Sequence, residues 1–465
     1  MAQEQRRSSV ELDIIVVGAG LSGLATAIGA ALSGHRVTVY ESAKELLEVG
    51  AGLQVTPNST RILQKWGLPD KLWQSAAEPT SLLVHRYSGE VLAMEKDFDK
   101  NIRRKYGAPF IDLHRVDMQL SLFDRAKELG VEFKLGQKIK SIDFDIPEVT
   151  CESGLKGKAD LIVAADGLWS RSRACLLGKE DPPLPTGDLA YRVVLKLDQI
   201  TDPELRLWVK YPSCHFWIGP GAHAVGYSLR AGEMYNIVLL VPDDLPAGVS
   251  KQTGSIEEMK ALFKGWDPVL GRFLDLVDGV EKWKLMHREE LDSWVNDKSN
   301  FVFVGDACHP MLPYLAQGAN SAIEDGAVLG GLLGHIESKS QLPKALKMYE
   351  TLRKARGEAI VRETFKQRAA FHMPDGPEQE ARDEIFRQYM DGEKLDGSLP
   401  SRWTCPEVQP WIYGYDAFKE VEDAVRKSPF AAVDQTEDAS CTNWSPPVIG
   451  RIASWIKSRM AWASL

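Results

Sequence analysis

The feature that most constrains the fold is the stretch DIIVVGAGLSGLATAIGAALSGHRVTVYE, over residues 13–41. Its apolar run IIVVG is typical of a buried parallel strand. Gly18, Gly20 and Gly23 then follow the pattern GxGxxG. The first glycine permits a tight turn, the second lets a pyrophosphate approach the backbone, and the third lets a helix pack on the sheet. The pattern predicts a helix over 21–32 whose first N–H groups and dipole favour phosphate.

A second apolar run, RVTVY, predicts another strand, and Glu41 follows directly. An acid about 20 residues after such glycines accepts hydrogen bonds from ribose hydroxyls. The order of strand, glycines, helix, strand and acid therefore predicts a bound dinucleotide with an unmodified adenosine ribose. This stretch alone leaves both NAD and FAD open.

Composition excludes several classes of protein. The net charge of -9 argues against non-specific nucleic-acid binding. The chain has no run of 18 apolar residues, which disfavours membrane insertion, and its polar N-terminus does not resemble a secretory signal. The six cysteines form no CxxC pair, so neither a metal site nor a disulfide framework is expected, and we expect a cytoplasmic protein. We expect the last segment, residues 448–465, to form a docked or frayed terminal helix, and weak membrane-surface contact is the alternative.

Two later segments distinguish FAD from NAD. In ADLIVAADGLWSRSRACLLG, residues 159–178, an apolar strand runs into Asp166 and Gly167. In NFVFVGDACHPMLPYLAQGANSAIEDGAVLGGLL, residues 300–333, another strand ends in Gly305 and Asp306, and a helix begins near Gly318 after a proline-containing loop. These segments resemble the DG and GD motifs of the group A flavoprotein aromatic hydroxylases, the para-hydroxybenzoate hydroxylase type. The resemblance extends from residue 13 to about residue 333, and more loosely to 424.

The resemblance implies a tightly bound FAD and assigns residues to it. Asp306 would contact the ribityl chain, Gly318 and Ala319 would face the pyrimidine end of the flavin, and Asp166 would lie in a segment that touches both FAD and a transient nicotinamide cofactor. Arg115, which opens a helix in HRVDMQLSLFDRA, matches an arginine that contacts FAD.

The segment GAGLQVTPNSTRIL matches the loop that passes the flavin, with Gly52 and Gln54 as contacts. Other roles remain open for some of these residues. Asp306 could be only a turn or helix-capping residue, and Arg115 could be a surface ion-pair partner. Cys308 and His309 are interpreted as packing residues rather than catalysts.

The chain has no second GxGxxG after a later strand, unlike glutathione-reductase-like flavoenzymes, and it lacks the WxWxIP motif of flavin halogenases. In group A hydroxylases NADPH or NADH visits, reduces the flavin and leaves. Oxygen then adds at flavin C4a, and the resulting hydroperoxide passes one oxygen atom to an electron-rich aromatic ring.

Between the DG and GD motifs, five segments alternate apolar and polar residues and predict an antiparallel sheet: LAYRVVLKL, LRLWVKY, HFWIGPG, AHAVGYSL and YNIVLLV. The predicted fold is therefore α/β. A Rossmann-like FAD-binding domain (1–185 and 286–370) carries an inserted, mostly antiparallel β-sheet substrate domain (186–285). A C-terminal helical region and tail (371–465) follows.

Two residues of this sheet are candidate catalytic residues. Arg192, in LAYRVV, puts a permanent cation in an apolar strand, and because a buried unpaired charge is costly it needs either a carboxylate or the substrate as its partner. In fungal relatives an arginine in this AYR context is catalytic, and Tyr227, in HAVGYSLRAG, matches a tyrosine that contacts substrate.

The chain resembles fungal secondary-metabolite monooxygenases, which include salicylate-hydroxylase-like phenol oxidisers and the indole oxidases of the paraherquamide and notoamide pathways. From this resemblance we favour epoxidation of the indole 2,3-bond of a prenylated indole alkaloid, leading to a spiro-oxindole. Phenol hydroxylation is the alternative, since spacing and composition do not separate the two. A phenol benefits from a base, and His215 and His223 are interpreted as surface or structural residues.

An indole needs no base, and Arg192 could stabilise the alkoxide formed when the epoxide opens, or more boldly act as a general acid. Two other classes stay open: an FAD-dependent reductase or oxidase without oxygen insertion, and a non-catalytic flavin-binding protein.

Overall fold

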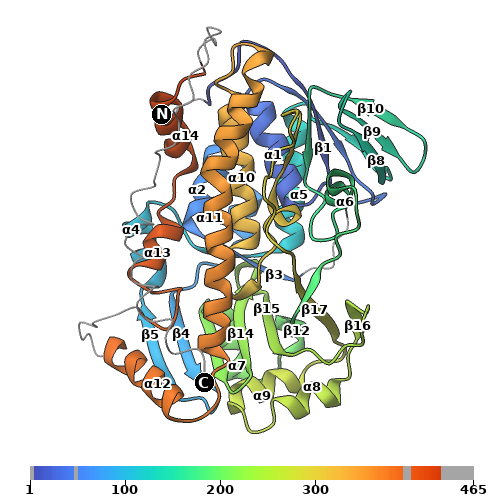
Figure 1. Cartoon of the computed structure of the whole chain (residues 1–465). Helices are drawn as coiled ribbons and strands as arrows, with labels where there is room; N and C mark the ends of the chain where they lie inside the picture. The colour runs from blue at the N-terminus through green and yellow to red at the C-terminus, as the bar shows by residue number, and fades with distance from the viewer. Residues whose placement is uncertain (1–4, 47–50, 391–398, 431–465) are drawn as a thin grey trace. The chain divides into compact units, whose positions relative to one another are not determined.

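The dinucleotide-binding stretch forms the strand, helix and strand that its sequence predicts. β1 (Asp13–Val17), α1 (Leu21–Leu32) and β2 (Arg36–Tyr40) follow one another, and the two strands pair in parallel. The turn needs its glycines, because Gly18 has a φ of +104° and a Cβ on Gly23 would lie 1.9 Å from the carbonyl oxygen of Gly18. The computed structural model describes residues 5–46, 51–390 and 399–430 (Figure 1).

A five-stranded parallel sheet continues from this unit, in the order β18-β11-β1-β2-β7. Its remaining strands are β7 (Glu132–Lys134), β11 (Leu161–Ala164) and β18 (Phe301–Phe303). β11 leads into the Asp166 motif and β18 into the Asp306 motif. Because the carboxyl ends of parallel strands meet at one edge, the sheet gathers the Gly18, Asp166 and Asp306 turns there.

Two helices rich in small residues pack closely beside this edge. A Cβ on Gly326 of α10 (Gly318–Leu333) would lie 2.6 Å from the backbone of Ala25 in α1, and one on Gly330 would lie 2.4 Å from the backbone of Gly29. Larger side chains at these positions would separate the helices. The glycines therefore let the two helices lie in backbone contact.

A second sheet has eight strands in the order β16-β17-β12-β15-β14-β13-β4-β5. All neighbours are antiparallel except β13 and β4. The strands are β4 (Ser81–Arg86), β5 (Val91–Lys96), β12 (Leu184–Lys196), β13 (Cys214–Gly219), β14 (Ala222–Leu229), β15 (Met234–Pro242), β16 (Lys251–Thr253) and β17 (Glu281–His287). Residues 81–96 thus add two strands to those from the range 186–285.

One predicted strand is a helix instead. The segment LRLWVKY was predicted to be extended, but α7 (Pro203–Lys210) occupies it. Pro203 stands in the first turn, and the side chain of Asp202 caps the helix by accepting hydrogen bonds from the N–H groups of Glu204 and Leu205. Leu205 and Val209, four residues apart, are both buried. The strand prediction for this segment was therefore wrong, because the capping residues just before the segment begin a helix.

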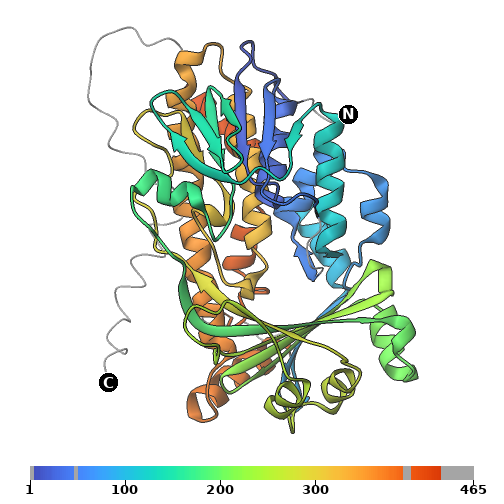
Figure 2. The same cartoon turned by 90° about the vertical axis from the view of Figure 1, so that its right-hand side faces the viewer.

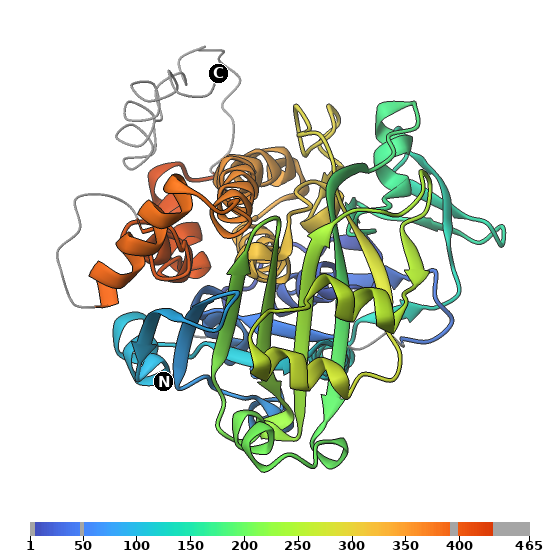
Figure 3. The ribbon, with the colours of Figure 1, turned by 90° about the horizontal axis from the view of Figure 1, so that it is seen from below.

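The two faces of the eight-stranded sheet have different neighbours. α7, α8 (Ile256–Leu262) and α9 (Pro268–Asp275) cover one face, where Trp217, Tyr235 and Phe273 belong to one buried apolar cluster. Figure 2 shows α8 and α9 beneath the sheet, with the parallel sheet on the opposite side, and Figure 3, seen from below, shows the two helices in front of the sheet. The uncovered face therefore looks toward the dinucleotide-binding edge.

The other strands form two small sheets: β3 (Gly52–Val55) with β6 (Ile111–His114), and β8 (Ile139–Asp143), β9 (Glu148–Cys151) and β10 (Lys156–Lys158). The remaining helices are α2 (Pro57–Lys65), α3 (Asp70–Ser75), α4 (Phe98–Tyr106), α5 (Arg115–Glu128), α6 (Arg171–Leu177), α11 (Leu342–Phe371), α12 (Pro377–Met390), α13 (Val408–Tyr413) and α14 (Ala417–Lys427).

Within the described ranges, no helix is long and apolar enough to cross a membrane. The segment considered for membrane-surface contact, residues 448–465, lies outside the described residues.

Candidate active site

A cavity of about 880 Å³ lies between the carboxyl edge of the parallel sheet and the open face of the eight-stranded sheet. Every site residue predicted from the sequence lines it except Gly23, which packs beneath the glycine turn. The lining residues among them are Gly18, Gly20, Glu41, Gly52, Gln54, Arg115, Asp166, Arg192, Tyr227, Asp306, Gly318 and Ala319. Segments far apart in the sequence therefore meet in one place.

At the glycine turn, the backbone itself lines the cavity, without side chains over it. No heavy atom of the described residues lies within 4 Å of a Cβ built on Gly20, so the turn leaves room for a group to approach. Glu41 braces the turn, because its carboxylate accepts hydrogen bonds of 2.7 Å from the N–H groups of Ala19 and Ala43. α1 begins here, and none of the described side chains caps its N-terminus. Its free N–H groups suit an anion such as a pyrophosphate.

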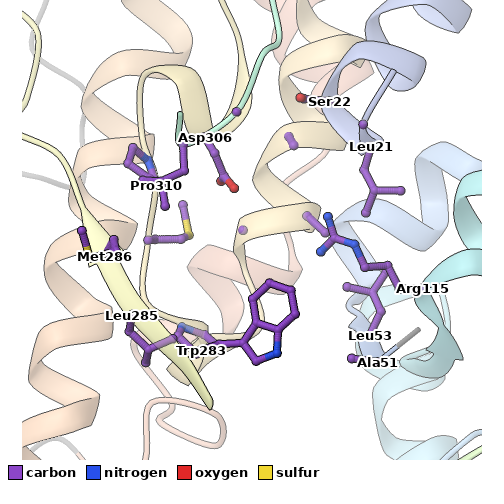
Figure 4. Close-up of a pocket in the computed structure, with 18 of the residues that line it drawn as sticks. Leu21, Ser22, Ala51, Leu53, Arg115, Trp283, Leu285, Met286, Asp306 and Pro310 are labelled. Carbon is purple, nitrogen blue, oxygen red and sulfur yellow. The ribbon is translucent and has the colours of Figure 1, made fainter. Parts of the chain in front are cut away.

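A carboxylate and a guanidinium point into the middle of the cavity from opposite sides. Figure 4 shows Asp306, from the turn after β18, facing the side of the cavity on which Arg115 lies at the start of α5. Asp306 is exposed to the cavity, but protein surrounds it, and this desolvation raises the pKa of its carboxyl group, while His309 and Arg115 act in the opposite direction. The pair offers both an acceptor and a cation to a polar ligand.

The N-terminus of α10 forms another part of the wall. Gly318, Ala319 and Ala322 line the cavity, so the helix presents its backbone there. The side chain of Gln317, the preceding residue, donates to Thr56 and to the carbonyl of Leu315, and among the described residues no side chain caps the helix. A dipole end that faces the cavity stabilises negative charge. Together with the open Gly20 turn, Arg115 and Asp306, this wall fits a flavin dinucleotide.

At the end of the cavity formed by the eight-stranded sheet, the register of the strands determines which side chains line the wall. Side chains at paired positions of adjacent strands share a face, and β12, β15, β14 and β13 place two rows of paired residues across the open face. One row is Arg192, Val238, Val225 and Phe216; the next is Ala190, Leu240, His223 and Ile218. All of these residues except Ile218 line the cavity, and Arg192 and His223 are the polar members of the two rows.

Arg192 lies against an aromatic ring. Its guanidinium carbon is 4.8 Å from the ring centroid of Trp283, and the Lys251 ammonium is 4.4 Å from the same centroid. Trp283 itself lines the cavity, as Figure 4 shows. Glu281 stands opposite Arg192 in the register of β12 and β17. The indole ring and the strand therefore hold the cation at the cavity wall.

Tyr227 lies deeper in the wall. Its side chain is buried, and burial raises the pKa of its hydroxyl well above the usual value, so the phenol stays neutral. A Cβ on Gly52 would lie 2.5 Å from the Tyr227 hydroxyl oxygen, so Gly52 is needed where the two strands meet. Gln54, beside it, donates a 3.0 Å hydrogen bond to Asp112.

His223 is a functional candidate that the sequence interpretation missed. It lines the cavity and is only 2% exposed, so of the two expected roles, surface or structural, the surface one is wrong. Burial lowers the pKa of its imidazole well below 6.5, which leaves the ring neutral. The signal was available in AHAVGYSL, because His223, Val225 and Tyr227 alternate along one strand and therefore share a face.

His215 was interpreted in the same way and lies on the other face. It is buried between the helix side of the sheet and Trp208, with ring centroids 4.0 Å apart, and hydrogen-bonds to His85 at 3.0 Å. Of the two roles expected for His215, surface or structural, the structural one is therefore confirmed.

Comparison with known proteins identifies the family. The model of the FAD binding domain family matches residues 11–364. The chain belongs to this family. FAD-dependent monooxygenase OpS4 of Beauveria bassiana (strain ARSEF 2860) is 51% identical over 420 residues, covering 89% of this chain and 97% of OpS4. 3-Hydroxybenzoate 6-hydroxylase of Polaromonas naphthalenivorans (strain CJ2) is 31% identical over 409 residues, covering 87% and 96%.

Among solved structures, CtdE in complex with FAD and substrate 4 superposes with a TM-score of 0.76 at 21% identity, covering 90% of this chain and 98% of CtdE. The protein is therefore an FAD-dependent monooxygenase of the para-hydroxybenzoate hydroxylase type. The names of its relatives argue against the reductase and oxidase alternative.

Proposed function

We propose that this monooxygenase hydroxylates the ring of a phenol that carries an acidic substituent, using NADPH or NADH and molecular oxygen. The observation that carries the proposal is that His223 and Arg192 project from adjacent rows of one sheet face into the same cavity. A neutral base and a permanent cation are what an ionisable phenol and its carboxylate require.

His223 supplies the base. Attack on an aromatic ring is easier when its hydroxyl is ionised, so a group that takes the phenol proton accelerates the reaction. A histidine protonated at neutral pH could not do this, but burial holds the pKa of His223 well below 6.5 and keeps a nitrogen lone pair free. The sequence-based preference for an indole depended on the lack of such a base.

Arg192 supplies the anion site. Its guanidinium always carries a charge and binds a carboxylate in a bidentate geometry. The stack on Trp283 limits the directions in which the guanidinium can point. The carboxylate of the substrate would bind there, which orients the ring between Phe216 and Trp283 along the apolar wall.

The rest of the cavity serves the cofactor. FAD reduced by NAD(P)H would supply the activation of molecular oxygen, from which one oxygen atom is transferred. Asp306, Arg115 and the N-terminus of α10 would hold the cofactor, and Val225, Val238 and Leu240 would exclude water from the reacting ring. His223 takes the phenol proton, and Arg192 balances the charge of the bound anion.

The relatives support a phenolic acid, since 3-hydroxybenzoate 6-hydroxylase is named for one and is 31% identical to this chain. Indole 2,3-epoxidation of a prenylated alkaloid is the second candidate. The observation that favours it is the cation at the wall of an aromatic cavity, where Arg192 would stabilise the alkoxide of an opening epoxide.

The test is NAD(P)H consumption and product mass for the purified protein in air. The panel contains 3-hydroxybenzoate, salicylate, their methyl esters and methyl ethers, and a prenylated bicyclic indole. We expect one oxygen atom to be added to a free phenolic acid, with the ester failing through loss of the anion and the ether through loss of the ionisable proton. Oxygenation of the indole alone would overturn the proposal in favour of the second candidate.

A further inference from the structure

His223 is one half of a buried pair, and the other half comes from a distant part of the chain. The Nδ1 atom of His223 lies 2.7 Å from Nε2 of His372, the residue that follows α11. Both side chains are buried, at 2% and 8% exposure, and their ring centroids are 4.9 Å apart. We propose that His372 is a positioning residue that fixes the tautomer of His223 and accepts its proton when the substrate phenol ionises. The inference rests on the proposed phenol hydroxylation.

Only one arrangement of the hydrogens in this pair lets His223 act as a base toward the substrate. Burial lowers the pKa of both imidazoles, that of His372 to about 4, so both rings are neutral and each carries one N–H. One of the two facing nitrogens must donate and the other accept. Since Nδ1 of His223 faces His372, Nε2 is the nitrogen left for the cavity. That nitrogen is free to accept a proton only when His223 carries its hydrogen on Nδ1 and donates it to His372.

The same hydrogen bond provides a path for the proton. The phenol O–H bond breaks and an N–H bond forms at Nε2 of His223. The Nδ1–H bond of His223 then breaks, and a bond forms at Nε2 of His372. The result is a phenolate, a neutral His223 and an imidazolium at His372, so the charge has moved one residue away from the cavity. The proton returns by the reverse path when the ring hydroxyl of the product reforms.

One neighbouring carboxylate favours a temporary positive charge on His372, while burial and a neighbouring arginine oppose it. The carboxylate of Asp188, on β12, raises the pKa of His372, while Arg368, one turn earlier on α11, lowers it, and burial outweighs both. Asp188 is held in place by Arg368 at 2.6 Å and by the hydroxyl of Tyr314. Tyr314 also contacts both imidazole rings, with centroid distances of 5.1 Å and 5.7 Å.

The backbone keeps His372 in register with the strand. Its carbonyl accepts a 3.0 Å hydrogen bond from the N–H of Gly221, two residues before His223. Substitution of the His372 side chain leaves this bond possible, so variants can retain the local fold.

The chain offers a matched control. His85 and His215 form a second buried pair on the same sheet, with Nε2 and Nδ1 3.0 Å apart, but they lie on the helix-covered face and away from the cavity. Loss of either pair removes a buried histidine hydrogen bond, so a general cost in stability affects both. Only loss of His372 changes the proton path.

The experiment compares wild type with H372Q, H372F and H215Q, using whichever of 3-hydroxybenzoate and salicylate the wild type hydroxylates. Glutamine can accept the hydrogen bond of His223 but cannot carry the proton onward; phenylalanine does neither. Phenolate formation in the oxidised enzyme complex is followed by stopped-flow absorbance. The tautomer of His223 is read by ¹⁵N NMR of the histidine-labelled full chain.

We expect phenolate formation to slow by at least ~10-fold in both His372 variants, with His223 keeping its Nδ1–H in H372Q and losing that preference in H372F. H215Q should match wild type in both measurements. A wild type with its proton on Nε2 of His223, or His372 variants as fast as H215Q, would overturn the inference and leave phenol hydroxylation standing. If wild type hydroxylates neither phenol, both the proposed function and this inference are wrong.

Discussion

The imidazole of His309 donates a 2.6 Å hydrogen bond from Nε2 to Oδ2 of Asp325, and neither side chain has any exposed surface. The same carboxylate oxygen accepts the N–H of Gly305 at 2.9 Å, and Oδ1 accepts from Arg353 at 2.7 Å. Asp325 therefore ties α10 and α11 to the loop that carries Asp306. His309, which lies next to the GD motif in the sequence, has a structural role in this network.

Removing the carboxylate should destabilise the fold. D325N leaves Arg353 without one of its partners in a fully buried site, and such a change costs about 3–5 kcal/mol. We expect a lower free energy of unfolding in urea and a weaker hold on FAD, measured by flavin content after gel filtration. D423N is the control, because Asp423 pairs with Lys419 and Arg426 on an exposed helix, where solvent screens the ion pairs and their loss changes stability little. Equal stability of the two variants would contradict the structural role.

The histidines predict how stability depends on pH. Burial lowers the pKa of seven of them: His35, His85, His114, His215, His223, His335 and His372. Below pH 6.5 the unfolded chain binds protons that the folded chain does not, so the free energy of unfolding falls as pH falls. His309 acts in the opposite direction, since its pKa is raised and its contribution is full below 6.5 and lost as pH rises through the raised value.

We expect these seven histidines to outweigh the groups whose pKa is raised in the folded chain, which are His309 and the buried carboxyl groups of Glu95, Asp112 and Asp306. Each fully buried neutral histidine contributes up to about 1.4 kcal/mol per pH unit. Urea unfolding between about pH 7.5 and 5.5, above most carboxylate titrations, should show stability decreasing toward acid. H215Q should reduce the slope. A stability that rises toward acid would mean that these rings are protonated in the folded protein.

Local patterns in the sequence predicted the elements around the cofactor. The glycine turn, α1, β2 and the start of α10 all depend on residues adjacent in the chain, so periodicity and turn chemistry were sufficient. The predictions that failed or were missing mostly concern contacts between residues far apart in the sequence. α7 was misread because its capping residues lie before the segment, and nothing in the sequence joins residues 81–96 to β13 or His372 to His223. Which side chains meet in the cavity depends on those long-range pairings.

The glycines of the turn should respond differently to alanine. A Cβ on Gly23 would collide with the carbonyl oxygen of Gly18, while one on Gly20 meets open space in the cavity. We expect G23A to lower the melting temperature and lose FAD, and G20A to keep the melting temperature of the cofactor-free protein while binding FAD more weakly. Calorimetry and flavin titration measure these effects. G271A, at a position with nothing within 4 Å among the described residues, is the control. The explanation fails if G20A unfolds the protein as readily as G23A.

Arg192 should affect the substrate and not the cofactor. Removing a charged hydrogen-bond donor costs about 1.5–3 kcal/mol, so R192A should weaken binding of a phenolic acid by about 10- to 100-fold and abolish product. R192K keeps the charge but not the bidentate geometry or the stack on Trp283, and we expect intermediate loss. Product mass, substrate titration and flavin content are measured together, and W283F tests the stack alone. Loss of FAD in R192A would show that Arg192 supports the fold, whereas retained FAD without product places it at the substrate.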